Sequence, residues 1–250
     1  MNRKKTVLVF IIKCICIPAV AVLLKKPYRK IDEEKYMDMW KLWTLGEQVD
    51  GVEIANVGSS HGAYDFVYDG LTEEGYSCFN FGGVSQTYQY DLALLQEYGA
   101  HLNKGCVLFI PVSYFSFNSE TVNDTEAQAL SVKYYHFLSP KNIPDYDLYT
   151  DIVTTRLPIL SAGEDLLKLL PEFSLCMDEA AAAQFAERAA SRYDRHFNNK
   201  EELFLPEREE QLLSLIDYCK KHEYTPVLIT TPFSSYYNAP VSEEFFDRFY

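Results

Sequence analysis

The amino-acid sequence predicts an α/β protein with a doubly wound parallel sheet, covered by helices on both faces. Apolar runs of five to seven residues, typical of buried strands, alternate with stretches whose apolar residues recur at helical spacing. Strands that alternate with helices pair in parallel through right-handed crossovers. The expected strands are residues 52–57, 77–81, 106–112 and 227–231. Between them we expect a short helix over about residues 64–72, a helix that Ser85 caps and that runs to about residue 98, and a turn at residues 103–105 that leads into the third strand.

Length and composition favour a folded domain over a disordered chain. The 250 residues suffice for one large domain with a substantial core, and 48% of them are hydrophobic. The formal net charge of -13 argues against a nucleic-acid-binding surface. The 19 Tyr and 16 Phe would suit a carbohydrate-facing cleft or a core, and we favour the core.

The sequence carries no signal for a metal or a cofactor. None of the six cysteines forms a Cys-x-x-Cys pair, and no His-x-x-x-His pair or Gly-x-x-x-x-Gly-Lys loop occurs. A disulfide framework is not expected in a chain of this length. We therefore expect no cofactor, no metal and no nucleotide.

An apolar segment over residues 6–24 lies between two basic clusters and predicts a membrane anchor or an uncleaved signal over residues 1–30. Lys13 within this segment disfavours membrane insertion by about 2.5 to 3.5 kcal/mol. The twelve Val, Leu, Ile and Phe residues of the segment together favour insertion by about 4 to 7 kcal/mol, so insertion is still favourable. A cleaved signal peptide, with a site at residues 19–21, stays open as an alternative. Because positive charge flanks both ends, the sequence does not decide the orientation.

Three further parts are expected after the anchor. A juxtamembrane helix is predicted over residues 31–46, within a segment that ends at residue 50. Its two tryptophans could lie at the lipid headgroups or pack on the domain, and we favour packing. The α/β domain follows over residues 51–250. A helical insertion at about residues 113–205, far longer than a crossover needs, could form a lid or be a solvated decoration.

The first strand ends in the sequence Val-Gly-Ser-Ser-His-Gly, over residues 57–62. Gly58 permits a sharp turn, and the Ser60 hydroxyl would then project at the carboxyl edge of the sheet, where ligands of open α/β sheets bind. This arrangement is typical of a nucleophilic serine. The alternative is a polar strand-to-helix loop in which Ser59 or Ser60 caps the helix.

A serine nucleophile needs a base and an oxyanion site. Gly82 and Gly83, after the second strand, would permit the close backbone approach of an oxyanion loop, or form only a turn. None of the five histidines has an Asp three residues before it. His61 is expected to make structural hydrogen bonds, and His196, with Asp194 nearby, lies in the insertion.

The Gly-x-Ser turn after the first strand and the glycines after the second strand resemble the sequence blocks of the SGNH/GDSL hydrolase superfamily. In that family a Gly-x-Ser block follows the first strand, as Gly58 to Ser60 does, and a Gly follows the second strand, as Gly82 does. The third block has an Asn where this chain has Ser113, and the final Asp-x-x-His is not found. The likeness covers residues 50–118 and 207–235. It is strongest to the bacterial cell-surface branch, near the D-alanyl-lipoteichoic acid transfer and polysaccharide O-acetylation proteins.

The resemblance implies a flavodoxin-like, three-layer fold and a membrane-anchored serine esterase or O-acyltransferase. Ser60 would form the acyl-enzyme, and Gly82, Gly83 and Ser113 would hold the oxyanion. The expected substrate is an extracytoplasmic glycan or a teichoic-type polymer, with a membrane-bound acyl-transfer partner and no nucleic acid. The expected location is the cell membrane, with the domain outside the cytoplasm. The alternative is a non-catalytic module that binds a cell-surface polymer or a membrane partner, which Ser113 favours a little.

The sequence stops within an amphipathic helical pattern that begins near Ser242. The last helix has no following strand, and no Asp-x-x-His block occurs. We therefore expect a C-terminally incomplete fragment whose base lies beyond Tyr250, and which has no esterase activity alone.

Overall fold

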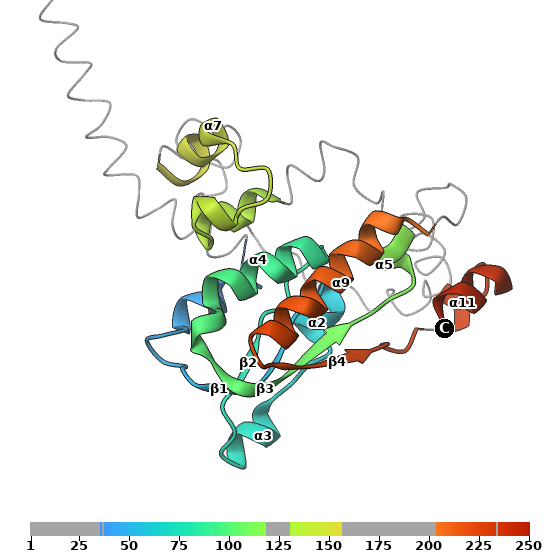
Figure 1. The fold of residues 1–250 in the computed structure, drawn as a ribbon, viewed down its shortest axis with the longest axis horizontal. Coiled ribbons are helices and arrows are strands. Elements are labelled where there is room, and N and C mark those ends of the chain that lie inside the picture. Colours follow the sequence, from blue (N-terminus) through green and yellow to red (C-terminus); the bar gives the residue numbers. More distant parts are fainter. Residues whose placement is uncertain (1–35, 37, 119–130, 157–203, 234) are drawn as a thin grey trace, which may run out of the picture.

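The computed structural model describes residues 36, 38–118, 131–156, 204–233 and 235–250. Within them the chain is an α/β protein built on a four-stranded parallel sheet (Figure 1). Strand β1 pairs in parallel with β2 and β3, and β3 pairs in parallel with β4. The predicted parallel sheet is confirmed. Its spatial order is β2 (Cys78–Asn80), β1 (Val52–Asn56), β3 (Leu102–Pro111) and β4 (Thr225–Ile229).

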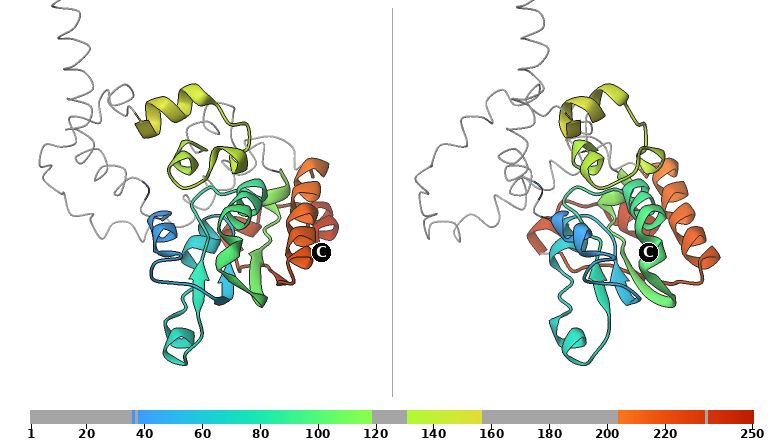
Figure 2. Two further views of the ribbon diagram at one scale, coloured as in Figure 1. Left: turned by 60° about the vertical axis from the view of Figure 1, so that its left-hand side comes forward. Right: turned by 90° about the vertical axis from the view of Figure 1, so that its left-hand side faces the viewer.

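The helices are short, apart from two that pack against each other. Helices α4 and α9 lie side by side in Figures 1 and 2, and residues from both belong to the main apolar core. The helical elements are η1 (Trp40–Thr44), α2 (Ser60–Tyr64), α3 (Asp69–Glu73), α4 (Tyr88–Tyr98), η2 (Gly99–His101), α5 (Phe115–Asn118), η3 (Val132–His136), η4 (Pro140–Asn142), α7 (Leu148–Asp151), the π-helical η5 (Ile152–Arg156), α9 (Pro206–Lys221), α10 (Ser235–Asn238) and α11 (Glu243–Phe249).

The core lies between the central strands and the α4–α9 pair. Strands β1 and β3 contribute fully buried apolar side chains, as the apolar runs predicted. Helix α9 begins with Pro206 in its first turn, where the missing N–H costs nothing, and buries Leu215 and Cys219. A second apolar cluster, at the carboxyl end of β3, contains Tyr114, Phe115, Tyr237, Val241 and Phe245.

Strand β3 is longer than the sequence predicted, because a bulge replaces the expected turn before residue 106. Val52 pairs with Leu102 and Ile54 with Val107, so the register shifts between these positions. Gly105 adopts φ +81°, and its N–H donates to the Glu223 carbonyl at 2.7 Å. The residues expected to turn therefore stay in the strand. Strand β4 covers residues 225–229, two residues earlier than predicted.

Two helix predictions also differ from the structure. A helix was expected over residues 64–72, but α2 begins at Ser60 and a separate helix, α3, follows. Ser85 was expected to cap the next helix, yet the N-cap of α4 is Thr87. Ser85 has φ +57°, a left-handed conformation that cannot start a helix. The predicted start of the last helix near Ser242 is correct, since the Ser242 side chain caps α11.

The segment before β1 packs on the domain. Of the helix expected over residues 31–46, the described part contains only the short 3-10 helix η1. Met39 and Leu42 are fully buried, and Trp40 and Trp43 contact each other and Phe137. The predicted packing of these tryptophans on the domain is therefore seen, with Trp43 still 37% exposed.

Other predictions fall on residues outside the described ones. These are the anchor over residues 1–30, the helices that the sequence predicts within the insertion near residues 162–170 and 178–193, and His196 with Asp194. The described parts of the insertion, residues 113–118, 131–156 and 204–205, contain α5, η3, η4, α7 and η5. Among the described residues, no helix has the length and apolar character needed to cross a membrane.

Candidate functional site

The turn after β1, residues 57–60 (here the β1 turn), brings two serines to the carboxyl edge of the sheet. Gly58 has φ +110°, and a Cβ there would lie 2.9 Å from Cγ of Pro111, so this position requires glycine. Ser59 is the N-cap of α2 but makes no side-chain cap hydrogen bond, and Ser60 is the first helical residue. Strand β1 lies between β2 and β3, so the turn sits where the strand order reverses. Open α/β sheets bind ligands at this point.

Two asparagines at the ends of β1 and β2 hold α2 in place. Asn56 Nδ2 donates to the Gly62 carbonyl at 2.8 Å and to Asn80 Oδ1 at 3.1 Å. Asn80 Nδ2 donates to the carbonyls of Ala63 and Phe66 at 3.3 and 3.4 Å. Because Asn56 is fully buried, these bonds satisfy an amide that could not remain unpaired without cost.

Gly62 and Gly82 let α2 and the loop after β2 touch through their main chains. A Cβ on Gly62 would lie 2.3 Å from the Val57 carbonyl oxygen, and one on Gly82 would lie 2.2 Å from the Gly62 carbonyl carbon. Neither position has room for a side chain. The predicted close backbone approach at Gly82 is therefore present, and its partner is α2.

The loop after β2, residues 81–86 (here the β2 loop), has its amide groups engaged within the chain. The Gly82 N–H donates to Asn80 Oδ1 at 2.8 Å, and the Gly83 N–H donates to the Gly58 carbonyl at 3.0 Å. An oxyanion at Ser60 would have to replace these bonds to use either N–H. The oxyanion role of Gly82 and Gly83 remains a prediction, whereas their role in joining the loop to the β1 turn is seen directly.

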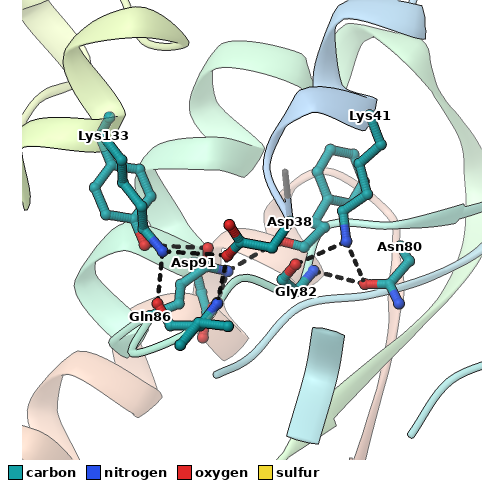
Figure 3. Close-up of polar contacts among 10 residues, drawn as sticks. Asp38, Lys41, Asn80, Gly82, Gln86, Asp91 and Lys133 are labelled. Carbon is teal, nitrogen blue, oxygen red and sulfur yellow. Dashed lines mark hydrogen bonds and ion pairs between the residues drawn. The ribbon is translucent and has the colours of Figure 1, made fainter. Parts of the chain in front are cut away.

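Charged side chains from two distant segments hold the same loop (Figure 3). Lys41 Nζ donates to the Gly82 carbonyl at 2.8 Å. Asp38 accepts from the Val84 N–H at 2.7 Å, and Lys133 donates to the Val84 carbonyl at 2.5 Å. Burial lowers the pKa of Lys41 to about 8, against the raising effect of Asp38. Burial also lowers the pKa of Lys133, which Asp38 again opposes.

His61 joins the carboxyl ends of three strands. Its Nδ1 lies 3.3 Å from Ser113 Oγ and 3.0 Å from Thr231 Oγ1, and its ring makes edge contacts with Phe115 and Phe233. Ser113 follows β3 and Thr231 follows β4, and both are buried. The structural hydrogen bonds expected of His61 are present. Ser113 is thus at the same edge as Ser60, in contact with a histidine.

Asp91, in the first turn of α4, contacts both the β1 turn and the β2 loop. Its Oδ1 accepts the Gly58 N–H at 2.8 Å and Gln86 Nε2 at 2.6 Å. The side chain is 1% exposed, and its Oδ2 has no hydrogen-bond partner among the described residues. Burial raises the pKa of Asp91 to about 7, although the bonds from Gln86 and Gly58 lower it. Asp91 was not identified from the sequence, because an acidic residue in the first turn of a helix usually indicates only a favourable interaction with the helix dipole.

Comparisons with protein-family models, curated proteins and solved structures found no match for this chain. Within the residues that the structure describes, no group of three or more His, Cys, Asp or Glu could hold a metal ion. The site must therefore be interpreted from its own geometry.

Proposed function

We propose that this chain is an SGNH-type serine esterase or O-acyltransferase in which Ser60 is the nucleophile. The observation that carries the proposal is the β1 turn. It places a serine at the start of α2, after a glycine in a left-handed conformation, at the point where the strand order reverses.

The strand order supports the finer fold assignment within this proposal. The chain passes from β1 to β2 on one side and then returns past β1 to β3. With right-handed crossovers, the two connections lie on opposite faces of the sheet, as a three-layer, flavodoxin-like sheet requires.

The proposed reaction is acyl transfer in two steps. Ser60 Oγ attacks an ester carbonyl while a general base accepts the hydroxyl proton. The tetrahedral intermediate collapses to an acyl-enzyme, and the alcohol leaves with that proton. Water or an acceptor hydroxyl then attacks the acyl-enzyme, which gives hydrolysis or transfer and restores Ser60. The resemblance assigns the base to an Asp-x-x-His block that the 250 residues do not contain.

The remaining parts of the proposal follow the resemblance and the apolar N-terminal segment. The substrate is an extracytoplasmic glycan or teichoic-type polymer, and the acyl donor is a membrane-bound partner. The chain is anchored in the cell membrane through residues 1–30, with the α/β domain outside the cytoplasm.

The second candidate is a non-catalytic SGNH-like module that binds a cell-surface polymer or a membrane partner. One observation favours it. Gly82 and Gly83 use their N–H groups within the chain, so neither glycine offers a free oxyanion donor in this conformation.

Reaction with a fluorophosphonate probe tests the choice between these candidates. The protein should be expressed from its complete genomic reading frame, and the modified serine mapped by peptide mass spectrometry. We expect the probe to modify Ser60, and Ser60→Ala to abolish the modification. Ser59→Ala is the matched control, because it removes a neighbouring hydroxyl that makes no cap bond.

Two results would contradict the nucleophile assignment. Equal modification of the Ser60→Ala protein would exclude Ser60. Modification that maps to Ser113 would instead identify the serine that contacts His61 as the reactive one. A protein that no probe modifies would favour the binding module.

A further inference from the structure

Within the described part of the chain, the Asp91 carboxylate bonds both to the β1 turn and to a residue of the β2 loop. It accepts the Gly58 N–H, two residues before Ser60, and the side-chain N–H of Gln86. Gln86 in turn donates to the Phe81 carbonyl at 3.0 Å (the Asp91–Gln86 pair is drawn in Figure 3). Asp91 therefore connects α4 with both loops that form the candidate site.

Among the described residues, no positively charged side chain is seen to bond to this carboxylate. The titratable groups that face it are Tyr88 on α4 itself, Tyr134 on η3 and Cys219 on α9. All three are neutral at pH 7, because burial raises the pKa of each. One carboxylate oxygen carries two hydrogen bonds, and the other has no partner among the described residues. A fully buried carboxylate without a cation is destabilised relative to its protonated form.

Protonation of Asp91 would weaken the hydrogen bond that its carboxylate accepts from the Gly58 N–H. A carboxylate oxygen accepts a charge-assisted hydrogen bond, which is roughly twice as strong as a bond to a neutral acceptor. When the proton is on Oδ2, Oδ1 becomes a neutral acceptor and holds the Gly58 N–H more weakly. Burial places this change near neutral pH, since it raises the pKa of Asp91 to about 7.

We propose that Asp91 is a positioning residue whose loss of a proton tightens the β1 turn and thereby fixes Ser60. The link to Ser60 reactivity rests on the proposed function, whereas the proton-dependent bond to Gly58 does not. The candidate site would then be best ordered above neutral pH and looser below it.

The Gly58 amide can be observed alone by selective labelling. The 250 residues contain 11 glycines, but Val57 and Gly58 form the only Val-Gly pair. In the 250-residue chain in detergent, valine labelled with ¹³C at the carbonyl and ¹⁵N-glycine should therefore give a single carbonyl-correlated amide signal. We expect its proton shift to move upfield as the pH falls, with a midpoint near 7. In Asp91→Asn this titration should vanish, while in Asp217→Asn, the same change on an exposed part of α9, it should persist.

The fluorophosphonate reaction of the protein expressed from its complete genomic reading frame supplies the second measurement. Relative to the wild-type protein above pH 8, Asp91→Asn should modify Ser60 about fivefold more slowly, and it should lose the part of the pH dependence centred near 7. A Gly58 signal that does not titrate, or that titrates equally in Asp91→Asn, would overturn the proposal. If Gly58 titrates as expected but no serine is modified in any variant, Asp91 holds the turn and the proposed function fails.

Discussion

Replacing Asp91 by Asn should change how the free energy of unfolding depends on pH. The folded protein raises the pKa of this carboxyl from 3.8 to about 7, mainly through burial. Between these values the folded state binds more protons than the unfolded state. Stability that is fully present below pH 3.8 is therefore lost progressively as the pH rises to 7, at about 1.4 kcal/mol per pH unit, and stays constant above it. The total is about 4 kcal/mol.

Asn cannot ionise, so the Asp91→Asn protein should lack this contribution. Its unfolding free energy relative to wild type should rise by several kcal/mol, about 4 at most, between pH 4 and pH 8. Taking the difference between the two proteins removes the titration of all other groups, which are common to both. Any constant cost from the buried Asn amide also cancels between the two pH values.

Urea unfolding of the full chain in a mild detergent, followed by tryptophan fluorescence, measures this difference. The two tryptophans are Trp40 and Trp43, which pack against Phe137 and so report on the folded domain. Asp217→Asn, on an exposed part of α9, is the matched control and should follow wild type at both pH values. A stability difference between wild type and Asp91→Asn that is the same at pH 4 and pH 8 would refute the reasoning, because it would mean that Asp91 keeps its ordinary pKa.

Two further predictions concern the β2 loop. Gly82→Ala should lower the unfolding free energy by about 3 kcal/mol, since its Cβ would overlap the Gly62 main chain. The control is Gly70→Ala in α3, which has open space around it and should raise the unfolding free energy by about 0.5 to 1 kcal/mol. If thermal unfolding shows equal effects for the two variants, the close contact at Gly82 is ruled out. In the wild-type protein, Lys41 should make the free energy of unfolding rise between pH 8 and 10.5, and Lys41→Met should remove this rise. The folded protein lowers the pKa of Lys41 to about 8 and so binds fewer protons than the unfolded chain in that range. An unchanged pH profile of urea unfolding in this variant would argue against the lowered pKa.

The sheet was predictable because its signals are local. Each strand is an apolar run of a few residues, and the alternation with helices determines its parallel pairing. The bulge in β3 was not predictable in the same way. Gly105 reads as a turn residue, and only its bond to the Glu223 carbonyl, more than a hundred residues later, keeps it in the strand.

The candidate site was predictable where a motif is continuous along the chain. The glycine and serines of the β1 turn could be identified, since their spacing alone indicates a strand followed by a sharp turn. The contact between His61 and Thr231 could not, because the two residues are 170 positions apart. Asp91 was missed for a related reason, since its partner Gly58 lies 33 positions away and offers only a main-chain N–H.

The segment before β1 belongs to the scaffold of the site. Asp38 and Lys41 bond through their charged groups to the main chain of the β2 loop, and Lys133, from the insertion, donates to the Val84 carbonyl of the same loop. Bonds to main-chain atoms do not depend on which side chains the loop carries, so they constrain the path of its backbone directly. Without Asp38 and Lys41, the Val84 N–H and the Gly82 carbonyl would lose these partners, at a cost of about 1 to 3 kcal/mol for each buried group. Since the Gly83 N–H of the same loop holds the Gly58 carbonyl, a change in the segment before β1 would reach the β1 turn through a continuous set of hydrogen bonds.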